Sequence, residues 1–440
     1  MLTRVCLTVA LALPISVLAQ VTPTANGPTE NESPMSAPPM VSGQALPTSV
    51  ESAENSNYLA GSVAFEAAYN DNLFPYYVTQ AISGMSYTIR PMISFDQSIS
   101  RFHQTWNYSP GFTIYQPIAA RNEFDQNVSM ILQYRLSEHA TLSGGDSFLK
   151  SSNVFNQGDS QLGGSVSGSP SSSPADLLFP FINRLSNTAN AQISYQYSAN
   201  SMIGGGGTVG LFQYPNQTQS SGIYDSTSRG GSAFYNRRIM GTQSIGANYQ
   251  YVEFLGNPAA GQVEMQLHTL MGFYSLTLEH RLSLSVSAGP QHSEYAQTSV
   301  PSVGSWRPSV MASIGWQGDR GSLVANYRQT ATTGGGLIGS HESKNASASA
   351  SWRMARTWTA GATATYSIYG SVANVSGQQG GHTVSGTASI DHPMGEHFVA
   401  RLGYQRIHLS YGGTAAATTT PDSDREFVSI SYQFKRPLGR

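Results

Sequence analysis

The sequence predicts an all-β fold: a transmembrane antiparallel β-barrel of about eighteen strands, with sixteen strands as the alternative. Apolar and polar residues alternate through most of residues 58–434, and a period of two is the pattern of a strand with two chemically different faces. Charged residues make up only 11% of the chain, against roughly 25% in soluble proteins. The connections between the predicted strands alternate between long and short, as they do in membrane-spanning barrels.

The clearest strand is predicted over residues 306–317, where every second residue is apolar and Trp306 and Trp316 stand near the ends of the apolar face. Ten residues of strand extend about 33 Å at roughly 3.3 Å per residue. At a tilt of about 40° this strand rises about 25 Å, the height of the apolar band between the aromatic girdles of a membrane barrel. Aromatic residues of other predicted strands are expected in the same girdles: Trp352, Trp358, Tyr432 and Phe434.

The N-terminal part of the chain is predicted to lie outside the barrel. Residues 1–19 have a positive charge at Arg4, an apolar core and small residues before Gln20, which is the pattern of a cleaved signal peptide. Cys6, the only cysteine, lies within it, so the mature chain is expected to have no disulfide. Residues 20–57 are rich in proline and polar residues without periodicity, which predicts a disordered leader. A leader that binds peptidoglycan or a partner protein is the alternative.

About eighteen segments carry the alternation strongly enough to be predicted as strands. They are residues 62–69, 86–95, 106–114, 128–136, 140–149, 189–197, 201–212, 228–238, 245–251, 263–273, 282–289, 306–317, 323–328, 345–353, 358–368, 383–391, 397–411 and 425–434. The pattern is weakest in the glycine-containing segments 140–149, 201–212 and 228–238, because glycine contributes no side chain to either face.

The connections between these strands fall into two classes. Short ones carry sequences such as LSEHA, LEHR and HPMGEH, and long ones lie near residues 70–83, 116–122, 150–186, 213–227, 255–261, 295–305, 331–342, 371–381 and 412–423. A soluble sandwich or a β-solenoid would not sort its connections in this way. The longest connection, 150–186, contains the apolar run Leu177–Phe181. This run predicts either a segment that folds into the barrel and narrows it, or an extension of the following strand.

The last predicted strand ends in a pattern of its own. Residues Val428–Phe434 alternate and finish on an aromatic residue, which resembles the terminal strand by which bacterial outer-membrane proteins are recognised by the barrel-assembly machinery. The usual pattern ends on the aromatic residue, whereas residues 435–440 follow here and are expected to form a periplasmic tail. Most of residues 58–434 is similar to porin-type outer-membrane barrels. That resemblance implies an outer-membrane location with the short turns in the periplasm.

The charged residues of the predicted strands fall in the polar set, opposite the tryptophans and tyrosines. A charged side chain that faces lipid at the bilayer midplane costs about 2–4 kcal/mol, so these residues are expected to face the interior of the barrel. The predicted pore-lining residues are Glu66, Arg90, Arg135, Glu264, His268, Arg328, Arg353 and Arg401. They can set the ion selectivity of a water-filled pore, or they can form internal ion pairs and sit near the rims.

Catalytic and metal-binding motifs are not found in the sequence. It has no HExxH spacing and no GxSxG elbow, and the glycine run 204–207 lacks the lysine of a phosphate-binding loop. Three turns share a Glu-His pair, at residues 138–139, 279–280 and 396–397, and polar turn chemistry explains them more simply than a metal or pH-sensing site. No cofactor and no metal are therefore expected. The net charge of −2 gives no basic surface for nucleic acid.

The resemblance and the polar interior together predict an outer-membrane porin or solute channel through which small solutes diffuse passively. Outer-membrane lipid is its expected surrounding, the oligomeric state stays open, and no enzyme activity is expected. The first alternative is a structural or export component of a polysaccharide or secretion system, whose periplasmic partner would bind residues 20–57. The second is a membrane-embedded hydrolase built from Ser, His and Asn side chains, although such enzymes usually have fewer strands.

Overall fold

The computed structural model describes most of the chain from residue 57 onward. The described ranges are residues 57–73, 81–116, 122–151, 183–215, 224–257, 261–278, 281–298, 300–332, 341–371, 380–412 and 422–438. Within them no helix is long and apolar enough to cross a membrane. The predicted signal peptide, nearly all of the predicted leader and the apolar run in connection 150–186 lie outside the described residues.

Eighteen strands account for nearly all of the described residues. They are β1 (Tyr58–Asn70), β2 (Gly84–Ile99), β3 (Phe102–Gln116), β4 (Glu123–Arg135), β5 (Ala140–Ser151), β6 (Arg184–Ser198), β7 (Ser201–Gln213), β8 (Ser226–Met240), β9 (Gln243–Gly256), β10 (Val263–Leu278), β11 (Leu282–Gln297), β12 (Val300–Gln317), β13 (Gly321–Thr332), β14 (His341–Arg353), β15 (Thr359–Ser371), β16 (Gly380–Met394), β17 (Phe398–Gly412) and β18 (Asp422–Pro437).

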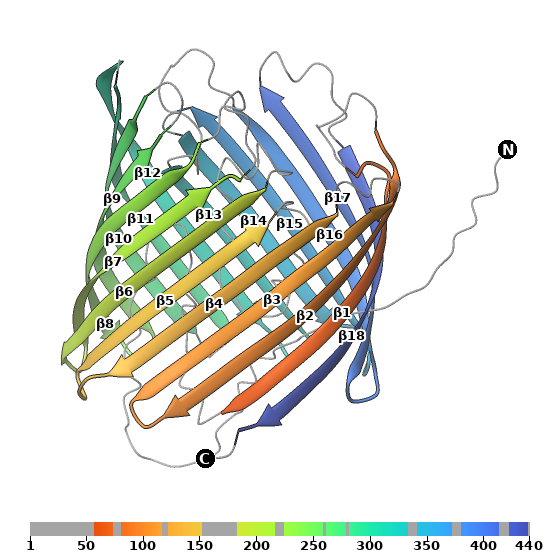
Figure 1. The fold of residues 1–440 in the computed structure, drawn as a ribbon. Helices are drawn as coiled ribbons and strands as arrows, with labels where there is room; N and C mark the ends of the chain where they lie inside the picture. The colour runs from red at the N-terminus through yellow and green to blue at the C-terminus, as the bar shows by residue number, and fades with distance from the viewer. Residues whose placement is uncertain are drawn as a thin grey trace.

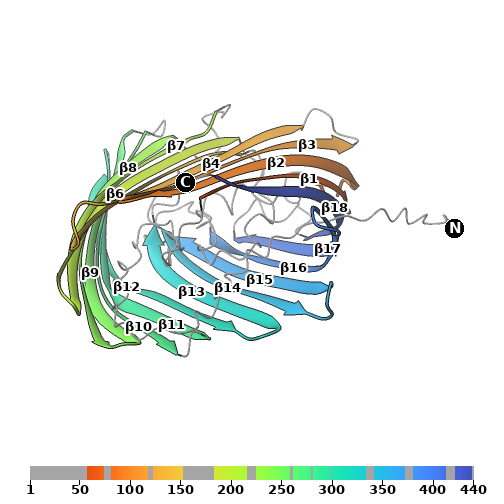
Figure 2. The same ribbon diagram turned by 90° about the horizontal axis from the view of Figure 1, so that it is seen from below.

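The strands form one closed antiparallel barrel (Figure 1). Each strand pairs with the next, and β1 pairs with β18 from Tyr58↔Pro437 to Asn70↔Arg425, which closes the sheet. Closure leaves no sheet edge at β1 or β18, because the backbone groups of the first and last strands bond to each other. The predicted barrel and its eighteen strands are confirmed. Seen from below, the cross-section is elongated rather than round (Figure 2).

Short and long connections alternate around the barrel as predicted, except that β11 and β12 are joined by a short connection. We call the end with the short connections the turn end and the opposite end the loop end. At the turn end Gly395 adopts φ 76° between β16 and β17, a conformation that glycine reaches without a steric penalty.

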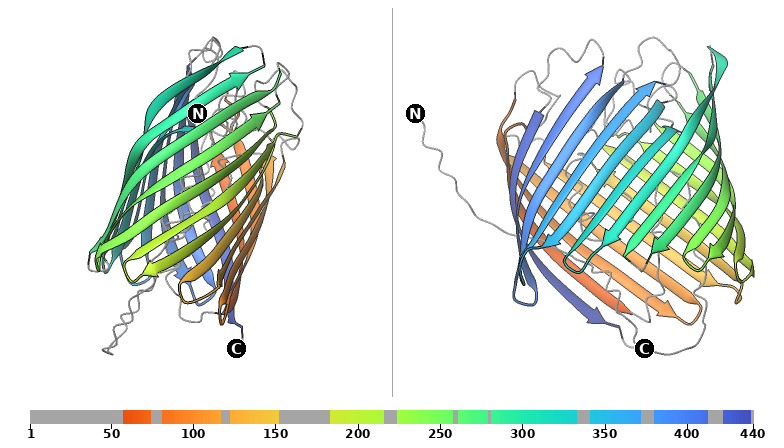
Figure 3. Two further views of the ribbon diagram at one scale, coloured as in Figure 1. Left: turned by 90° about the vertical axis from the view of Figure 1, so that its left-hand side faces the viewer. Right: turned by 180° about the vertical axis from the view of Figure 1, so that it is seen from behind.

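The predicted long connection at residues 295–305 is wrong. β11 runs to Gln297 and β12 starts at Val300, so these two strands form a tall hairpin at the loop end (Figure 3). The residues that resembled a loop are held by cross-strand pairing, for example Tyr295↔Val303. The sequence did not indicate this pairing, because Pro301 and Gly304 are both typical of connections.

The two faces of the barrel differ in polarity. Large apolar side chains such as Val63, Phe65 and Leu402 are exposed on the outer face, whereas the residues between them are mostly buried, small and polar. All six predicted girdle aromatics are exposed: Trp306, Trp316, Trp352, Trp358, Tyr432 and Phe434. Five of them lie near the turn end, and Trp306 lies toward the loop end, where it is 70% exposed. Their role at membrane interfaces stays a prediction.

The final strand is longer than predicted. Lys435, Arg436 and Pro437 were expected in a tail, but they pair with the first residues of β1. The ammonium nitrogen of Lys435 also lies 4.0 Å from the centroid of the Tyr58 ring. β18 continues past Phe434 because the start of β1 supplies a full set of backbone partners.

Glycines on the inner wall are covered by aromatic rings of neighbouring strands. A Cβ atom added at Gly246 would collide with the ring of Phe273 and with the backbone oxygen of Tyr235. Gly403 is covered in the same way by the ring of Phe427. Such aromatic–glycine pairs help to pin the register of neighbouring strands.

We therefore expect Gly246→Val to lower the free energy of unfolding by about 1–3 kcal/mol, because the added methyl groups would displace Phe273 and the β8 backbone. Denaturant titration of the protein in lipid vesicles would measure the change. Gly370→Val is the matched control, since a Cβ there has no neighbour within 4 Å. Equal stability losses in the two variants would contradict the proposed role of the ring contact.

A polar track along the inner wall

A line of polar residues runs across the inner wall from β14 to β4, each directly paired with the next. The line consists of Arg353, Thr359, Asp391, Arg401, Ser429, Glu66, Thr88, Thr113 and Glu123, and we call it the polar track. Arg353 is the last residue of β14, at the turn end, and Glu123 is the first residue of β4, at the loop end. Because the strands are tilted, the track crosses the whole height of the barrel.

The centre of the track is a buried ion pair. Arg401 Nε lies 2.6 Å from Asp391 Oδ1 and Arg401 Nη2 lies 3.1 Å from Asp391 Oδ2, so the guanidinium binds both carboxylate oxygens. Both side chains are only 8% exposed. A two-point contact of this kind fixes the orientation of the guanidinium as well as its position.

A second ion pair lies where the barrel closes. Glu66 of β1 contacts Arg425 of β18, and Arg425 also donates to Gln405 over 3.4 Å. The guanidinium carbon of Arg425 lies 5.2 Å from the centroid of the Phe427 ring. Further along the track, the hydroxyls of Thr88 and Thr113 are 3.0 Å apart. The acids and bases of the two ion pairs therefore neutralise each other.

The structure places the other predicted arginines on the inner face as well. Arg90 alternates with the exposed Ile89, and a Cβ atom added at Gly111 would meet both its Nε atom and the Asp125 side chain. Arg328 alternates with the exposed Tyr327 and therefore points to the opposite face. Arg135 and Arg353 are the turn-end residues of β4 and β14, and each follows an exposed aromatic residue of the outer face. Whether these side chains line a pore stays a proposal.

The placement of Glu264 and His268 corrects the prediction that they face the interior. Both alternate with buried apolar residues and share the face of the exposed Leu270, so they belong to the outer face. His268 Nδ1 lies 2.8 Å from the Tyr249 hydroxyl, on the same face. Toward the loop end, β10 turns its apolar residues inward and its polar residues outward. The rule that apolar residues face outward fails there.

Several inner-wall partners were missed by the sequence reasoning. Asp391 pairs with Arg401, Arg425 pairs with Glu66, and Glu123 accepts a hydrogen bond from the Tyr115 hydroxyl. Asp391 shared the alternation of the polar Thr387 and Ser389, so its face could have been predicted. Its partner could not, because ion pairing between strands depends on their register.

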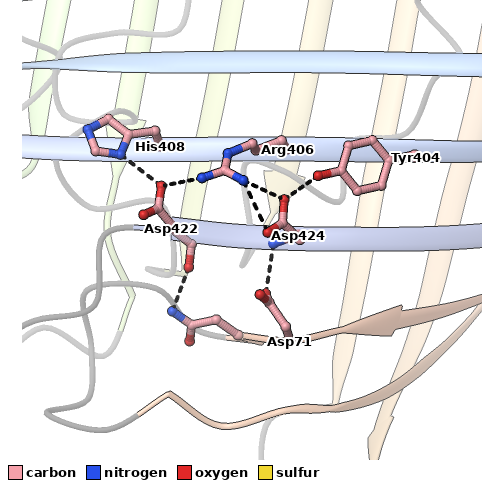
Figure 4. Close-up of polar contacts among 7 residues, drawn as sticks. Asp71, Tyr404, Arg406, His408, Asp422 and Asp424 are labelled. Atoms are coloured by element: carbon pink, nitrogen blue, oxygen red, sulfur yellow. Dashed lines mark hydrogen bonds and ion pairs between the residues drawn. The ribbon is translucent and has the colours of Figure 1, made fainter. Parts of the chain in front are cut away.

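A polar cluster also lies on the outer face near the loop end (Figure 4). Arg406 of β17 lies 3.6 Å from Asp422 and 3.4 Å from Asp424 of β18, and His408 lies 2.9 Å from Asp422. The Asp71 carboxylate accepts a hydrogen bond from the backbone N–H of Asp424 over 2.7 Å. These contacts join the end of β1 to β18, so we interpret the cluster as part of the barrel closure.

No group of three or more His, Cys, Asp and Glu side chains in the described ranges could hold a metal ion. Two of the Glu-His turns lie in these ranges, and their histidine rings contact tyrosine rings. His139 lies 6.5 Å from Tyr195 and His397 lies 5.6 Å from Tyr432, measured between ring centroids. The third turn, at residues 279–280, lies outside the described residues.

No family model and no curated protein matches the chain. Solved structures are similar in fold. OccK2 (OpdF) of Pseudomonas aeruginosa matches with 11% identity and a TM-score of 0.43, over 86% of this chain and 98% of that chain. The outer membrane protein OpdK of the same organism matches with 8% identity and a TM-score of 0.40, over 86% and 99%. The FrpB iron transporter of Neisseria meningitidis matches with 8% identity and a TM-score of 0.41, over 86% and 81%.

Proposed function

We propose that this protein is an outer-membrane channel through which small polar solutes diffuse passively along the inner wall of the barrel. The observation that carries the proposal is the polar track, which crosses the inner wall of a closed barrel whose outer face is apolar. The direction of passage would follow the solute gradient, since diffusion needs no energy source.

The outer face supports a membrane location. Exposed aliphatic and aromatic side chains occur on strands around the barrel, for example Phe65, Ile193, Ile314 and Leu402. Soluble monomers rarely expose continuous apolar patches larger than a few hundred Å². A closed barrel also satisfies its backbone groups internally, as a bilayer requires. The turn end would then face the periplasm and the loop end the exterior.

The inner wall beside the track supports solute passage because its side chains are small and polar. A second line of paired residues runs parallel to the track, from Arg425 through Gln405, Thr387 and Thr363 to Ser349. Hydroxyl and amide groups can replace part of the hydration of a passing solute, and short side chains leave volume for water.

Arg353 is expected to influence ion selectivity most directly, because it ends the track at the turn end and its side chain is exposed. Two unit charges 4 Å apart in water interact by about 1 kcal/mol, which corresponds to roughly a fivefold change in an equilibrium constant. Arg353→Glu should therefore raise the cation-to-anion permeability ratio several-fold. Reversal potentials in a salt gradient would measure it.

The matched control is Arg229→Glu, because Arg229 is exposed on the outer face, where it forms an ion pair with Glu253. Its reversal should leave the permeability ratio unchanged. If Arg353→Glu leaves the ratio as it is, or both variants change it equally, Arg353 does not stand at the pore mouth.

Passive diffusion itself is tested by swelling of proteoliposomes in uncharged sugars of increasing size. The proposal predicts swelling rates that fall steadily with sugar size and do not saturate with concentration. Saturable uptake of one sugar would instead indicate a specific transporter, and an absence of swelling would contradict a diffusion pore for such solutes.

A further inference from the structure

The barrel wall has an incomplete ladder between β12 and β13. These strands form only eight residue pairs, from Val310 to Gln317 of β12. Closer to the loop end, β12 stays paired with β11 as far as Val300, and β13 stays paired with β14 as far as Thr332. The loop-end parts of the two strands therefore have no ladder between them.

Two prolines account for the break. Pro290 of β11 and Pro308 of β12 lie directly opposite each other, and proline has no backbone N–H to donate. Two opposed prolines cannot exchange hydrogen bonds, and the backbone groups of such a pair point to the strands on either side. Pro308 therefore has no backbone N–H to donate to a carbonyl of β13. The register between β10 and β11 also omits Gly289 and Pro290, so the hairpin is loosened on both sides at one level.

Beyond the prolines, the β11–β12 hairpin overlaps the outer side of β13 and β14. Arg307 belongs to the inner face of β12, since it alternates with the exposed Trp306. Its Nη1 atom lies 3.4 Å from Glu342 Oε2. Glu342 pairs with Ala331, which shares the outer face of Tyr327, yet Ala331 is only 4% exposed. The inner face of one wall segment therefore covers the outer face of the next, and we call this overlap the lap joint.

The amide of Gln291 takes the place of the missing ladder. Its Oε1 accepts from the backbone N–H of Ala331 over 2.7 Å, and its Nε2 donates to the Ala331 carbonyl over 3.3 Å. Nε2 also donates to Thr269 Oγ1 over 3.0 Å. Gln291 is 3% exposed. The Gln291 side chain thus satisfies the backbone N–H and carbonyl of Ala331, which β12 would otherwise bind. The joint is therefore closed by side-chain hydrogen bonds, and a rotation of the hairpin can break them.

The interior of the lap joint is apolar. The buried side chains that meet there come from the inner face of β9–β11 and from β13: Phe254, Val263, Met265, Leu267, Tyr295 and Ala331. This apolar cluster interrupts the otherwise polar inner wall. Its chemistry suits a hydrocarbon chain and does not suit a hydrated ion.

A shallow groove on the outer face borders this joint. It has a volume of about 460 Å³ and is lined by residues of β11 and β12, among them the apolar Pro290, Trp306 and Pro308. Arg307 and Ser309 also line it, and both contact residues across the joint. Two cations, Arg307 and Lys344, share the single carboxylate of Glu342, which gives these three side chains a net positive charge.

We propose that the lap joint is a lateral binding site for a single-chain amphiphile with an anionic head, which reaches the apolar cluster from the outer groove when the β11–β12 hairpin swings on Pro290 and Pro308. The head would lie beside Arg307 and Lys344. The hydrocarbon chain would replace contacts among the buried apolar side chains. The site requires the membrane placement proposed above but not the solute pore.

The test uses the full-length protein in lipid bilayers with a photoactivatable long-chain fatty acid, followed by peptide mapping of the adducts. Met265 and Leu267 face inward and are buried, so adducts on them require an opened joint.

To hold the joint closed, a Ser309→Cys/Gln329→Cys variant in a Cys6→Ser background is bridged by a short thiol-specific linker. We expect adducts on Met265 and Leu267 before bridging and their loss afterwards. Absence of these adducts before bridging, or their persistence after it, would overturn the proposal.

The matched control bridges Ser322→Cys and Ser351→Cys, whose hydroxyls are 2.8 Å apart across the complete β13–β14 ladder. This bridge should leave the adducts in place, and their loss would overturn the role of the joint. Gln291→Leu removes the bridging amide without new cysteines and should raise the adduct yield several-fold; an unchanged yield would count against the proposal. Adduct formation is measured by peptide mapping and not by conductance, so its result does not depend on whether the barrel forms a pore.

Discussion

Arg401→Ala is expected to lower the free energy of unfolding by about 3–5 kcal/mol, because removal of one partner of a buried ion pair leaves the other charge uncompensated. Asp391 is 8% exposed and would lose both hydrogen bonds from the guanidinium. Denaturant titration of the folded barrel in vesicles, followed by tryptophan fluorescence, would measure the loss.

Two controls separate the lost charge pairing from a general effect of mutation. The double variant Arg401→Met/Asp391→Leu removes both charges and should recover most of the stability, since apolar replacement of a buried pair is often neutral. Arg281→Ala breaks an ion pair with Asp319 that is largely exposed, and such pairs contribute about 0–1 kcal/mol. A loss for Arg401→Ala no larger than that for Arg281→Ala would show that the Asp391 carboxylate is well solvated.

Ile314→Arg is expected to cost about 1–3 kcal/mol, because a charged side chain on the lipid face costs about 2–4 kcal/mol at the bilayer midplane and less toward the interface. Ile314 is exposed on the outer face of β12, two residues before Trp316. Its neighbour Ser313 points to the inner wall, between Ser285 and Asn326. Ser313→Arg should therefore cost much less, because its guanidinium would meet water and polar groups.

The comparison is made by unfolding both variants in the same lipid vesicles and by quantifying their insertion. The difference between the two positions matters more than either value, since they are adjacent in one strand. A larger penalty for Ser313→Arg than for Ile314→Arg would mean that the outer face is not in contact with lipid.

Local alternation was enough to predict the strands because the two faces of this barrel differ in polarity over most of its height. Alternation assigned Arg401 to the polar face of its strand, and the structure shows that this face is the inner wall. The same reasoning failed for His268, because β10 continues beyond the apolar band and reverses its polarity. Alternation states that two faces differ, but it does not state which face is inside.

Features that depend on register could not be predicted. Pro290 and Pro308 are ordinary prolines in the sequence, and only the pairing of β11 with β12 shows that they oppose each other. The ion pair of Asp391 with Arg401 and the hydrogen bond from Ala331 to Gln291 also depend on register. Each joins residues on different strands, so a shift of one residue in the pairing would abolish it.

If the inner wall encloses a water-filled path, single-channel recording in a planar lipid bilayer should detect it. The purified full-length protein should produce steady conductance steps that increase with salt concentration. Arg353→Glu should make the channel more selective for cations. A silent bilayer, with protein shown to be inserted and folded, would mean that the inner wall encloses no continuous water-filled path.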